Sequence, residues 1–230
     1  MTVNHPVPGS SPGGGVVHFI IINMTIGLTK LNHPTLGEVL FHRCMGQVSK
    51  DNQDIIEHHL SKPEFNWQFT KSTIVEGTNP DEFSKFDDVS ILAHQLVIDN
   101  RSCSDYTSPL IDHTEIKDLI NRHHLSGEIL RAQVNLFVKR DKVINPCPHI
   151  DIRSVPHIGI LYYVNDADGD TVFYDRSEYD SNEELGLMKE WRRESPKRGD
   201  ILIFDGRIYH SPSCPVEATH RISVNFDMLK

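Results

Sequence analysis

The sequence has no apolar run that could cross a membrane. Its longest run, Val16–Ile22, has the length of a strand and is interrupted by a histidine, whereas a spanning helix needs about 20 apolar residues. No positive charge precedes this run, and no clear small-residue cleavage site follows it. We therefore expect neither a membrane protein nor a secretory signal.

Cysteine and positive charge are both scarce. The four cysteines (Cys44, Cys103, Cys147 and Cys214) form no C-x-x-C pair, so we expect reduced thiols in a cytoplasmic protein rather than a disulfide framework. The formal net charge is −9 at pH 7. Such a charge repels a phosphate backbone, which disfavours nucleic acid as a partner.

The remaining composition is that of an ordinary globular domain. The chain has 230 residues, 38% of them hydrophobic and 24% charged, which suffices for one well-filled domain. Residues 1–15 are rich in glycine, proline and serine, so we expect a mobile leader. Residues 16–230 are then a single domain, with residues 16–126 as an N-terminal support region and residues 127–230 as the core.

Two helices are predicted in the support region. Ser49 or Asp51 can cap a helix that ends before Pro63. Asp112 can cap a second helix, with Gly127 just beyond its end as a stop. The region thus supplies helices that can pack against a sheet.

Short β-like runs separated by turns follow Gly127. A strand is also expected at residues 66–75, whereas residues 185–194 fit either a short helix or a strand. This spacing of short strands predicts a mainly β (α+β) domain with a jelly-roll core and flanking helices. The strand candidates are Ile129–Lys139, His149–Ile152, Ile158–Asn165, Thr171–Asp175, Asp200–Phe204, Arg207–His210 and Arg221–Met228.

His149, Asp151 and His210 form a candidate metal site. Residues two apart on a strand project from the same face, so His149 and Asp151 can share one ion. His210 ends another strand candidate and can supply a third ligand. Two histidines and one carboxylate are the facial triad of oxygen-activating iron(II) enzymes, with three coordination positions left open. An H-x-D triplet alone also arises by chance as a hydrogen-bonded surface pair.

A second polar pattern follows the last histidine of this site. In Arg221-Ile222-Ser223-Val224-Asn225 polar and apolar residues alternate, so a strand would direct Arg221, Ser223 and Asn225 to one side. A guanidinium beside a hydroxyl is suited to bidentate binding of a carboxylate. The alternative is a strand whose polar face is merely solvated.

A series of stretches in the C-terminal half carries a family resemblance. They are His149-Ile150-Asp151, Ile160-Leu161-Tyr162-Tyr163-Val164-Asn165, residues 168–173, residues 196–205, Tyr209-His210 and Arg221-x-Ser223, with Leu130–Phe137 as a first core strand. In this order they resemble the iron(II)/2-oxoglutarate oxygenase superfamily, specifically its prolyl-hydroxylase-like branch and the small phage and bacterial members. Asp170 stands where a glycine or glutamate is usual, which affects a turn rather than a ligand. Residues 1–48 match no family.

The resemblance implies a double-stranded β-helix (jelly-roll) core and assigns roles to matching residues. His149, Asp151 and His210 would be the iron ligands and the catalytic centre. Arg221 would pair with the distal carboxylate of 2-oxoglutarate. The residues implied for the 2-oxoglutarate pocket are Arg221, Tyr163, Ser223, Thr171, Asn225 and Asn135, with Phe137 beside them.

The resemblance also implies a reaction. The enzyme would use Fe(II), 2-oxoglutarate and O2 to hydroxylate a C–H bond, releasing succinate and CO2. Related halogenases replace the carboxylate ligand by a small residue, so the retained Asp151 favours hydroxylation. The expected substrate is a peptidyl proline or a small molecule. The alternative is a non-catalytic cupin-like jelly roll that binds a metal or ligand, although such a site needs no carboxylate clamp like Arg221 and Ser223.

Several reactive side chains near the metal motif receive other interpretations. His157 is expected to pack or to support the site rather than to bind metal. Cys147 and Cys214 are expected to be buried or half-exposed thiols. For Arg153 and Arg207, contact with an anionic substrate and a solvated surface role are equally compatible with the sequence.

Overall fold

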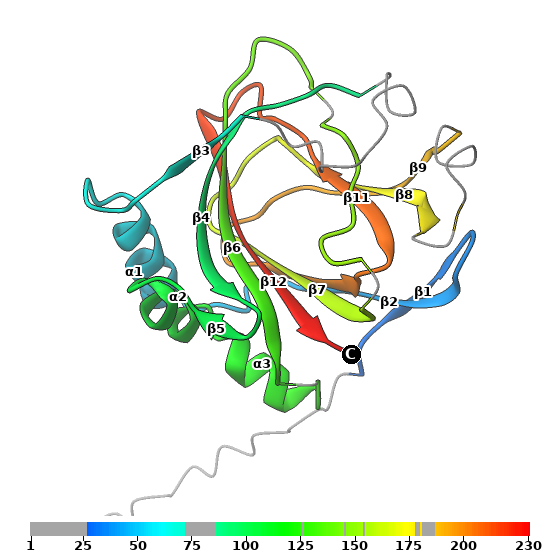
Figure 1. The fold of residues 1–230 in the computed structure, drawn as a ribbon, viewed down its shortest axis with the longest axis horizontal. Coiled ribbons are helices and arrows are strands. Elements are labelled where there is room, and N and C mark those ends of the chain that lie inside the picture. The colour runs from blue at the N-terminus through cyan, green and yellow to red at the C-terminus, as the bar shows by residue number, and fades with distance from the viewer. Residues whose placement is uncertain are drawn as a thin grey trace, which may run out of the picture.

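The computed structural model describes residues 27–71, 86–125, 127–144, 146–153, 155–177, 180 and 187–230. The expected leader at residues 1–15 and the strand-sized run at residues 16–22 lie outside these ranges. The elements in Figure 1 are β1 (Lys30–His33), β2 (Gly37–Cys44), α1 (Lys50–Leu60), β3 (Gln68–Thr70), β4 (Ile91–Ile98), β5 (Arg101–Ser102), α2 (Thr107–His113), α3 (Ile116–Arg122), β6 (Ile129–Val138), β7 (His157–Tyr163), β8 (Thr171–Ser177), β9 (Glu190–Glu194), β10 (Ile201–Asp205), β11 (Ile208–Pro212) and β12 (His220–Leu229).

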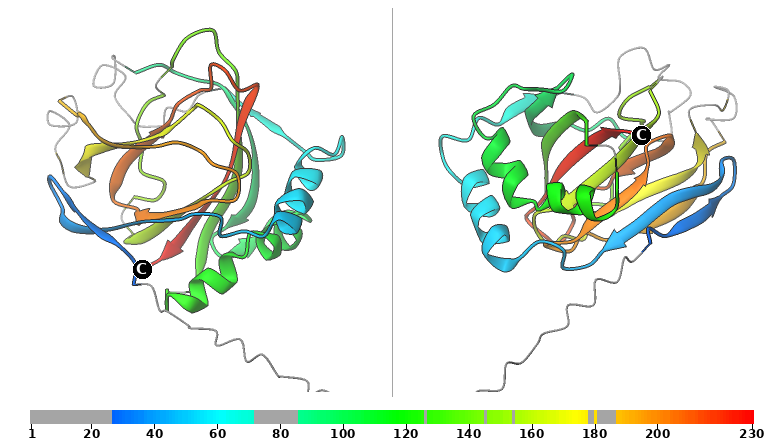
Figure 2. Two further views of the ribbon diagram at one scale, coloured as in Figure 1. Left: turned by 180° about the vertical axis from the view of Figure 1, so that it is seen from behind. Right: turned by 90° about the horizontal axis from the view of Figure 1, so that it is seen from below.

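Two antiparallel sheets face each other. The large sheet has the order β1-β2-β10-β7-β12-β6-β4-β3, with β5 on β4, and the small sheet has the order β11-β8-β9. The helices lie on the side of the large sheet that faces away from the small sheet (Figure 2). This arrangement is a jelly roll, so the expected fold class is confirmed.

The alternation of side chains along β7 shows how the two cores are separated. Ile158, Ile160 and Tyr162 point to the outer face, where they join the apolar side chains of the helices. Leu161 and Tyr163 point inward, to the apolar cluster between the sheets. Because both faces of β7 are covered, its sequence is a nearly continuous apolar run.

The first predicted helix is confirmed, and its cap is Ser49. The Ser49 side chain accepts a hydrogen bond from the backbone N–H of Asn52, and α1 ends at Leu60. The second predicted helix is wrong in its start and its stop. Asp112 does not cap a helix but lies inside α2, where it accepts hydrogen bonds from Ser108 and Lys117.

Glu115 divides the second helical region into α2 and α3. Its backbone is left-handed, with φ of 54°, and its carboxylate accepts hydrogen bonds from the Ser49 N–H and the Asn52 side chain. These contacts with α1 stabilise a break that local propensity does not predict. The chain then turns at His124, also with positive φ, so Gly127 is not the helix stop.

Six of the seven strand candidates after Gly127 are strands, with ends shifted by one or two residues. The seventh, His149–Ile152, forms only an isolated bridge, in which His149 and His210 exchange backbone hydrogen bonds of 2.9 and 3.0 Å. The ambiguous segment at residues 185–194 contains strand β9. Of the strand expected at residues 66–75, Gln68–Thr70 is observed, and residues 72–75 lie outside the described ranges.

The described ranges contain neither a membrane-spanning helix nor a disulfide. No helix there is long and apolar enough to cross a membrane. None of the four cysteines takes part in a disulfide, and Cys147 and Cys214 are both buried. Burial raises the pKa of both thiols, which keeps them protonated near neutral pH.

Candidate functional site

His149, Asp151 and His210 converge on one point between the sheets. The backbone bridge between His149 and His210 sets their rings 4.8 Å apart, centroid to centroid. Asp151 follows, so that its Oδ1 lies 3.6 Å from His149 Nε2 and its Oδ2 lies 3.3 Å from His210 Nε2. One ligand atom from each of the three side chains lies within 4.8 Å of the other two. In the described part of the chain, this is the one cluster of three or more His, Cys, Asp or Glu side chains that could hold a metal ion.

The electrostatics of these three residues suit a cation. Burial alone would raise the pKa of Asp151, but Arg131 and the two histidines outweigh it and hold the pKa well below its usual range. Burial lowers the pKa of His210, which favours the neutral ring. The His210 Nδ1 lies 3.1 Å from the Ile208 carbonyl oxygen. A carbonyl can only accept, so Nδ1 carries the proton and Nε2 keeps its lone pair for a metal.

This donor set fits Fe(II). Two neutral imidazoles and one carboxylate are the ligands of non-haem iron oxygenases. Cis ligands of an ion with bonds of about 2.1 Å lie about 3 Å apart, and the Asp151 oxygens are only slightly farther from the two histidine nitrogens. Small side-chain rotations are therefore enough to bring the three donors onto one ion.

A cavity of about 280 Å³ adjoins the three candidate ligands. One wall is formed by the inward-facing residues of β6 and β12, two neighbouring strands of the large sheet (Figure 1). The residues between them, such as Val134 and Val224, point outward to the helices. The cross-strand pairs that line this wall are Phe137–Arg221, Asn135–Ser223, Gln133–Asn225 and Arg131–Asp227.

Arg221 is a buried cation at one end of this wall. Its exposed fraction is 1%, its guanidinium donates to Thr171 Oγ1 at 2.9 Å, and the Phe137 and Tyr163 ring centroids are 5.5 and 6.0 Å from its Cζ. No ion pair joins Arg221 to a carboxylate in the described ranges. Burial lowers the pKa of this guanidinium, because a charge without a counter-ion is costly in a low-dielectric interior.

The other residues implied for the 2-oxoglutarate pocket line the same cavity as Arg221 or lie directly behind its wall. Ser223, Asn225, Asn135 and Thr171 line the cavity. Tyr163 lies behind Thr171, with its hydroxyl 2.9 Å from Thr171 Oγ1. Burial raises the pKa of Tyr163 to about 12, so the phenol stays neutral.

Arg131, Gln133 and Asp227 also line the cavity, and the sequence interpretation did not select them. The two-residue alternation that places Arg221, Ser223 and Asn225 on one face of a strand also places Asp227 on that face. On β6 the same alternation places Gln133 and Arg131 on the face that carries Asn135. The missing information was the pairing register of β6 with β12, which sets Arg131 opposite Asp227.

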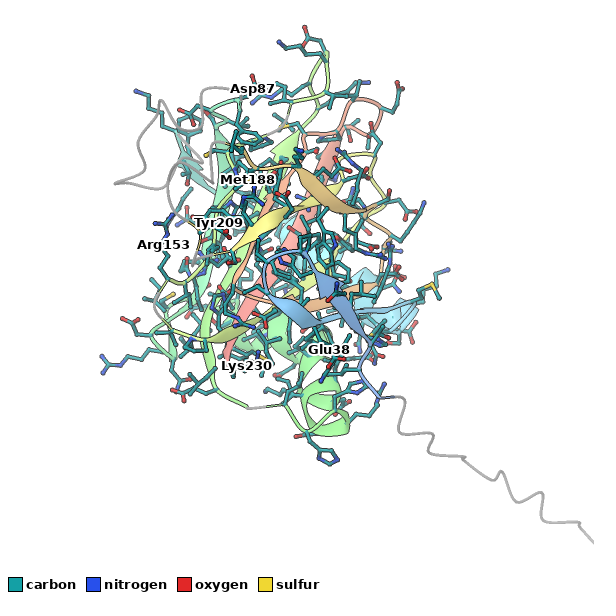
Figure 3. The ribbon with its side chains drawn as sticks, turned by 90° about the vertical axis from the view of Figure 1, so that its right-hand side faces the viewer. Glu38, Asp87, Arg153, Met188, Tyr209 and Lys230 are labelled. Atoms are coloured by element: carbon teal, nitrogen blue, oxygen red, sulfur yellow. The ribbon has the colours of Figure 1, made fainter. Side chains whose placement is uncertain are left out.

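The residues given other interpretations have partners other than the three candidate ligands. His157 is 1% exposed, with its Nε2 3.8 Å from Asp227 Oδ1. Arg207 forms an ion pair of 2.7 Å with buried Asp205. Arg153 donates to the Tyr209 hydroxyl at 3.3 Å, and Figure 3 shows these two residues next to each other.

Comparisons with known proteins relate the chain to one structural group. No protein-family model and no curated protein sequence matches the chain. Among solved structures, an oxidoreductase of the 2OG-Fe(II) oxygenase family from Burkholderia pseudomallei superposes with a TM-score of 0.56 and 13% identity, covering 83% of this chain and 84% of that chain. The epimerase SnoN from nogalamycin biosynthesis, which is non-heme and alpha-ketoglutarate-dependent, has a TM-score of 0.58 and 14% identity, with 86% and 78% covered.

A third similar structure is a prolyl hydroxylase from Trichoplax adhaerens, solved with a peptide fragment of the hypoxia inducible factor oxygen degradation domain. Its TM-score is 0.53 with 12% identity, and the match covers 82% of this chain and 83% of that chain. At these identities the similarity establishes the fold. It does not extend to the reaction or the substrate.

Proposed function

We propose that this chain, which has the fold of the 2-oxoglutarate-Fe(II) oxygenases, is an Fe(II)- and 2-oxoglutarate-dependent dioxygenase that hydroxylates a C–H bond. The observation that carries the proposal is buried Arg221, which lines the same cavity as His149, Asp151 and His210. A metal triad and an unneutralised guanidinium in one cavity together fit a co-substrate that chelates a metal at one end and carries a carboxylate at the other.

The argument from Arg221 is one of charge. A buried guanidinium without a counter-ion destabilises the protein that contains it, so its retention calls for an anionic ligand. 2-Oxoglutarate supplies a carboxylate that can accept two parallel N–H bonds from Arg221. Thr171 and Ser223 add hydroxyl groups to the lining of the same cavity, and the neutral Tyr163 phenol is hydrogen-bonded to Thr171 Oγ1. A cupin-like site that only stores a metal needs none of these groups.

The remaining cavity residues orient the reactants and exclude water. His149, Asp151 and His210 would hold the iron, which supplies the redox chemistry that amino-acid side chains lack. The Phe137 and Phe204 rings line the cavity with apolar surface, which lowers the local dielectric and strengthens the interaction of Arg221 with a carboxylate. Retention of Asp151 as the carboxylate ligand favours hydroxylation over halogenation.

A peptidyl proline and a small molecule are the proposed substrate classes. Among proteins of this fold, the Trichoplax adhaerens enzyme was solved with a peptide, and SnoN was solved with Fe3+, alpha ketoglutarate and nogalamycin RO. Both classes are therefore compatible with this architecture. The net charge of −9 disfavours nucleic acid.

The test is release of succinate by purified protein supplied with Fe(II), 2-oxoglutarate and O2. We expect slow release without substrate and faster release with pools of peptides or small molecules that contain the substrate. His149→Ala should abolish both metal binding and succinate release. Arg221→Ala should raise the 2-oxoglutarate concentration needed for half-maximal rate by roughly 100-fold, since charge-assisted hydrogen bonds contribute about 1.5–3 kcal/mol each, and should leave metal binding intact.

Two outcomes would contradict the proposal. No succinate from any pool, combined with unchanged metal affinity in His149→Ala, would favour the alternative of a non-catalytic jelly roll. Equal loss of metal and of 2-oxoglutarate binding in Arg221→Ala would mean that Arg221 has a structural role.

A further inference from the structure

Arg131 joins a candidate metal ligand to a second buried carboxylate. Its Nη2 donates to Asp151 Oδ1, and its Nε donates to Asp227 Oδ2 at 2.7 Å. Arg131 and Asp227 are cross-strand partners on β6 and β12, at the end of the polar wall opposite the Phe137–Arg221 pair. The side chains of Asp151 and Asp227 are only 5% and 1% exposed.

We propose that Arg131 is a positioning residue that holds one oxygen of Asp151, so that only the other oxygen is available to the metal. The inference rests on the proposed function, because it assigns Arg131 a role in the same site. Asp227 acts in turn on Arg131, by anchoring its guanidinium.

The geometry separates the two oxygens of Asp151. Oδ1 accepts a hydrogen bond from Arg131 and lies 3.6 Å from His149 Nε2, whereas Oδ2 lies 3.3 Å from His210 Nε2, the nitrogen with the free lone pair. A guanidinium is a planar fork whose N–H groups have fixed directions. Once Asp227 holds Nε, the position of Nη2 is set, and with it the rotation of the Asp151 carboxylate.

The consequence concerns the number of open positions on a six-coordinate metal. Two histidines and one carboxylate oxygen leave three positions, which accommodate the two chelating atoms of 2-oxoglutarate and O2. A carboxylate bound through both oxygens would occupy one of these positions. By holding Oδ1, Arg131 keeps that position available.

Among the described residues, Arg131 is the one that donates a hydrogen bond to the Asp227 carboxylate. Its Oδ1 has no hydrogen-bond partner among the residues that the structure describes, and the nearest ring nitrogen, His157 Nε2, is 3.8 Å away. Burial, and then the charge of Asp151, raise the pKa of Asp227, which reflects two carboxylates with one guanidinium between them. Removing Arg131 would leave these carboxylates to repel each other and would free Asp151 to rotate.

The test uses Mn(II), which is stable in air and favours the same oxygen donors. Water-proton relaxation of the Mn(II)-loaded protein counts the waters on the metal. We expect about three waters in the wild type and about two in Arg131→Met, because both oxygens of Asp151 can then bind. The dissociation constant of 2-oxoglutarate should rise about 10- to 100-fold, while Mn(II) still binds.

The matched control is Gln133→Met, on the same face of β6 and in the same cavity. Within the described ranges the hydrogen-bond and ion-pair partners of Asp151 are Arg131, His149 and His210, and Gln133 donates to Asn135 instead. The number of bound waters in this variant should therefore stay at the wild-type value. Folding of each variant is checked by thermal melting. If Arg131→Met does not fold, the same measurements are made on Asp227→Asn, which removes the charge that anchors Arg131. The number of bound waters should then fall, and the dissociation constant of 2-oxoglutarate should rise, by less than expected for Arg131→Met.

The inference would be overturned if folded Arg131→Met protein had the wild-type number of bound waters and the wild-type affinity for 2-oxoglutarate. If Arg131→Met does not fold, the same result for folded Asp227→Asn protein would overturn it. This failure is distinct from failure of the proposed function. If the function is wrong, the wild-type protein itself binds no Mn(II) through His149 and releases no succinate. If only the inference is wrong, the wild type does both and the variants match it.

Discussion

Replacing Arg221 by methionine should stabilise the ligand-free protein while removing its response to 2-oxoglutarate. The guanidinium is 1% exposed and forms no ion pair within the described ranges. In the ligand-free state it is therefore a buried charge whose desolvation is not offset by a counter-ion. Methionine is unbranched and apolar, so it can occupy much of the same space beside Phe137 and Tyr163 without this cost.

Two opposing contributions set the change in the free energy of unfolding of ligand-free Arg221→Met. The substitution loses the hydrogen bond to Thr171, which contributes about 1.5–3 kcal/mol as a bond from a charged group, although Thr171 keeps Tyr163 as a partner. It also removes a desolvation penalty of several kcal/mol. We expect the free energy of unfolding of the ligand-free variant to be unchanged or higher by up to about 4 kcal/mol.

Thermal melting with and without ligand measures both effects. At a 2-oxoglutarate concentration 100-fold above its dissociation constant, the Mn(II)-loaded wild type should gain about 2.7 kcal/mol. For a chain of this size that corresponds to a rise in Tm of roughly 5–10 °C. Arg221→Met should show no such rise. A ligand-free variant less stable than the wild type by 2 kcal/mol or more, with its ligand-induced rise retained, would refute the charge argument.

Two further substitutions test the fold around the site. Burial alone would raise the pKa of Asp205, but hydrogen bonds from Arg207 and Lys230 outweigh it and lower the pKa to about 2. The charged carboxylate therefore stabilises the fold fully above pH 3.8, its ordinary pKa, and this stabilisation is lost as the pH falls toward 2. Asp205→Asn should lower the free energy of unfolding near pH 7 by about 1–2 kcal/mol, and urea unfolding should show a weaker pH dependence below pH 4. Gly159→Ala should cost about 1–3 kcal/mol in a thermal melt, because the added Cβ would collide with the Phe204 ring.

The glycine substitution has a matched control, and the aspartate substitution has an outcome that would contradict it. Gly127→Ala adds a Cβ with no neighbour within 4 Å, so its Tm should match the wild type within about 2 °C. Equal losses in Gly127→Ala and Gly159→Ala would mean that backbone entropy rather than the Phe204 contact is responsible. An unchanged acid profile in Asp205→Asn would show that Arg207 and Lys230 do not stabilise that carboxylate.

The residues of the candidate site could be selected from the sequence because the information that selects them is local. The spacing of His149 and Asp151 and the alternation from Arg221 to Asn225 depend only on the two-residue period of extended backbone. The period held even though His149 forms an isolated bridge rather than a full strand. Likewise, the cap at Ser49 needs only its own neighbours to form.

Features that depend on distant partners could not be derived in the same way. The break between α2 and α3 is stabilised by hydrogen bonds from α1 to Glu115, so Asp112 offered a plausible but wrong cap. The order of the large sheet, in which the early strand β2 pairs with β10, has no signature in the sequence of either strand. Such contacts depend on which strands meet, and pairing across long stretches of chain leaves little trace in composition.

The candidate metal ligands and Arg221 could therefore be selected by type and spacing from the sequence. Only the tertiary structure decided that they line one cavity and that Arg131 and Asp227 join them there. The physical reason is the register of β6 and β12: a shift by one residue would turn Arg131 away from Asp151 and toward the helices. The types of the side chains and their two-residue alternation can be read directly from the sequence. The pairing register of two strands is set by the packing of the whole sheet.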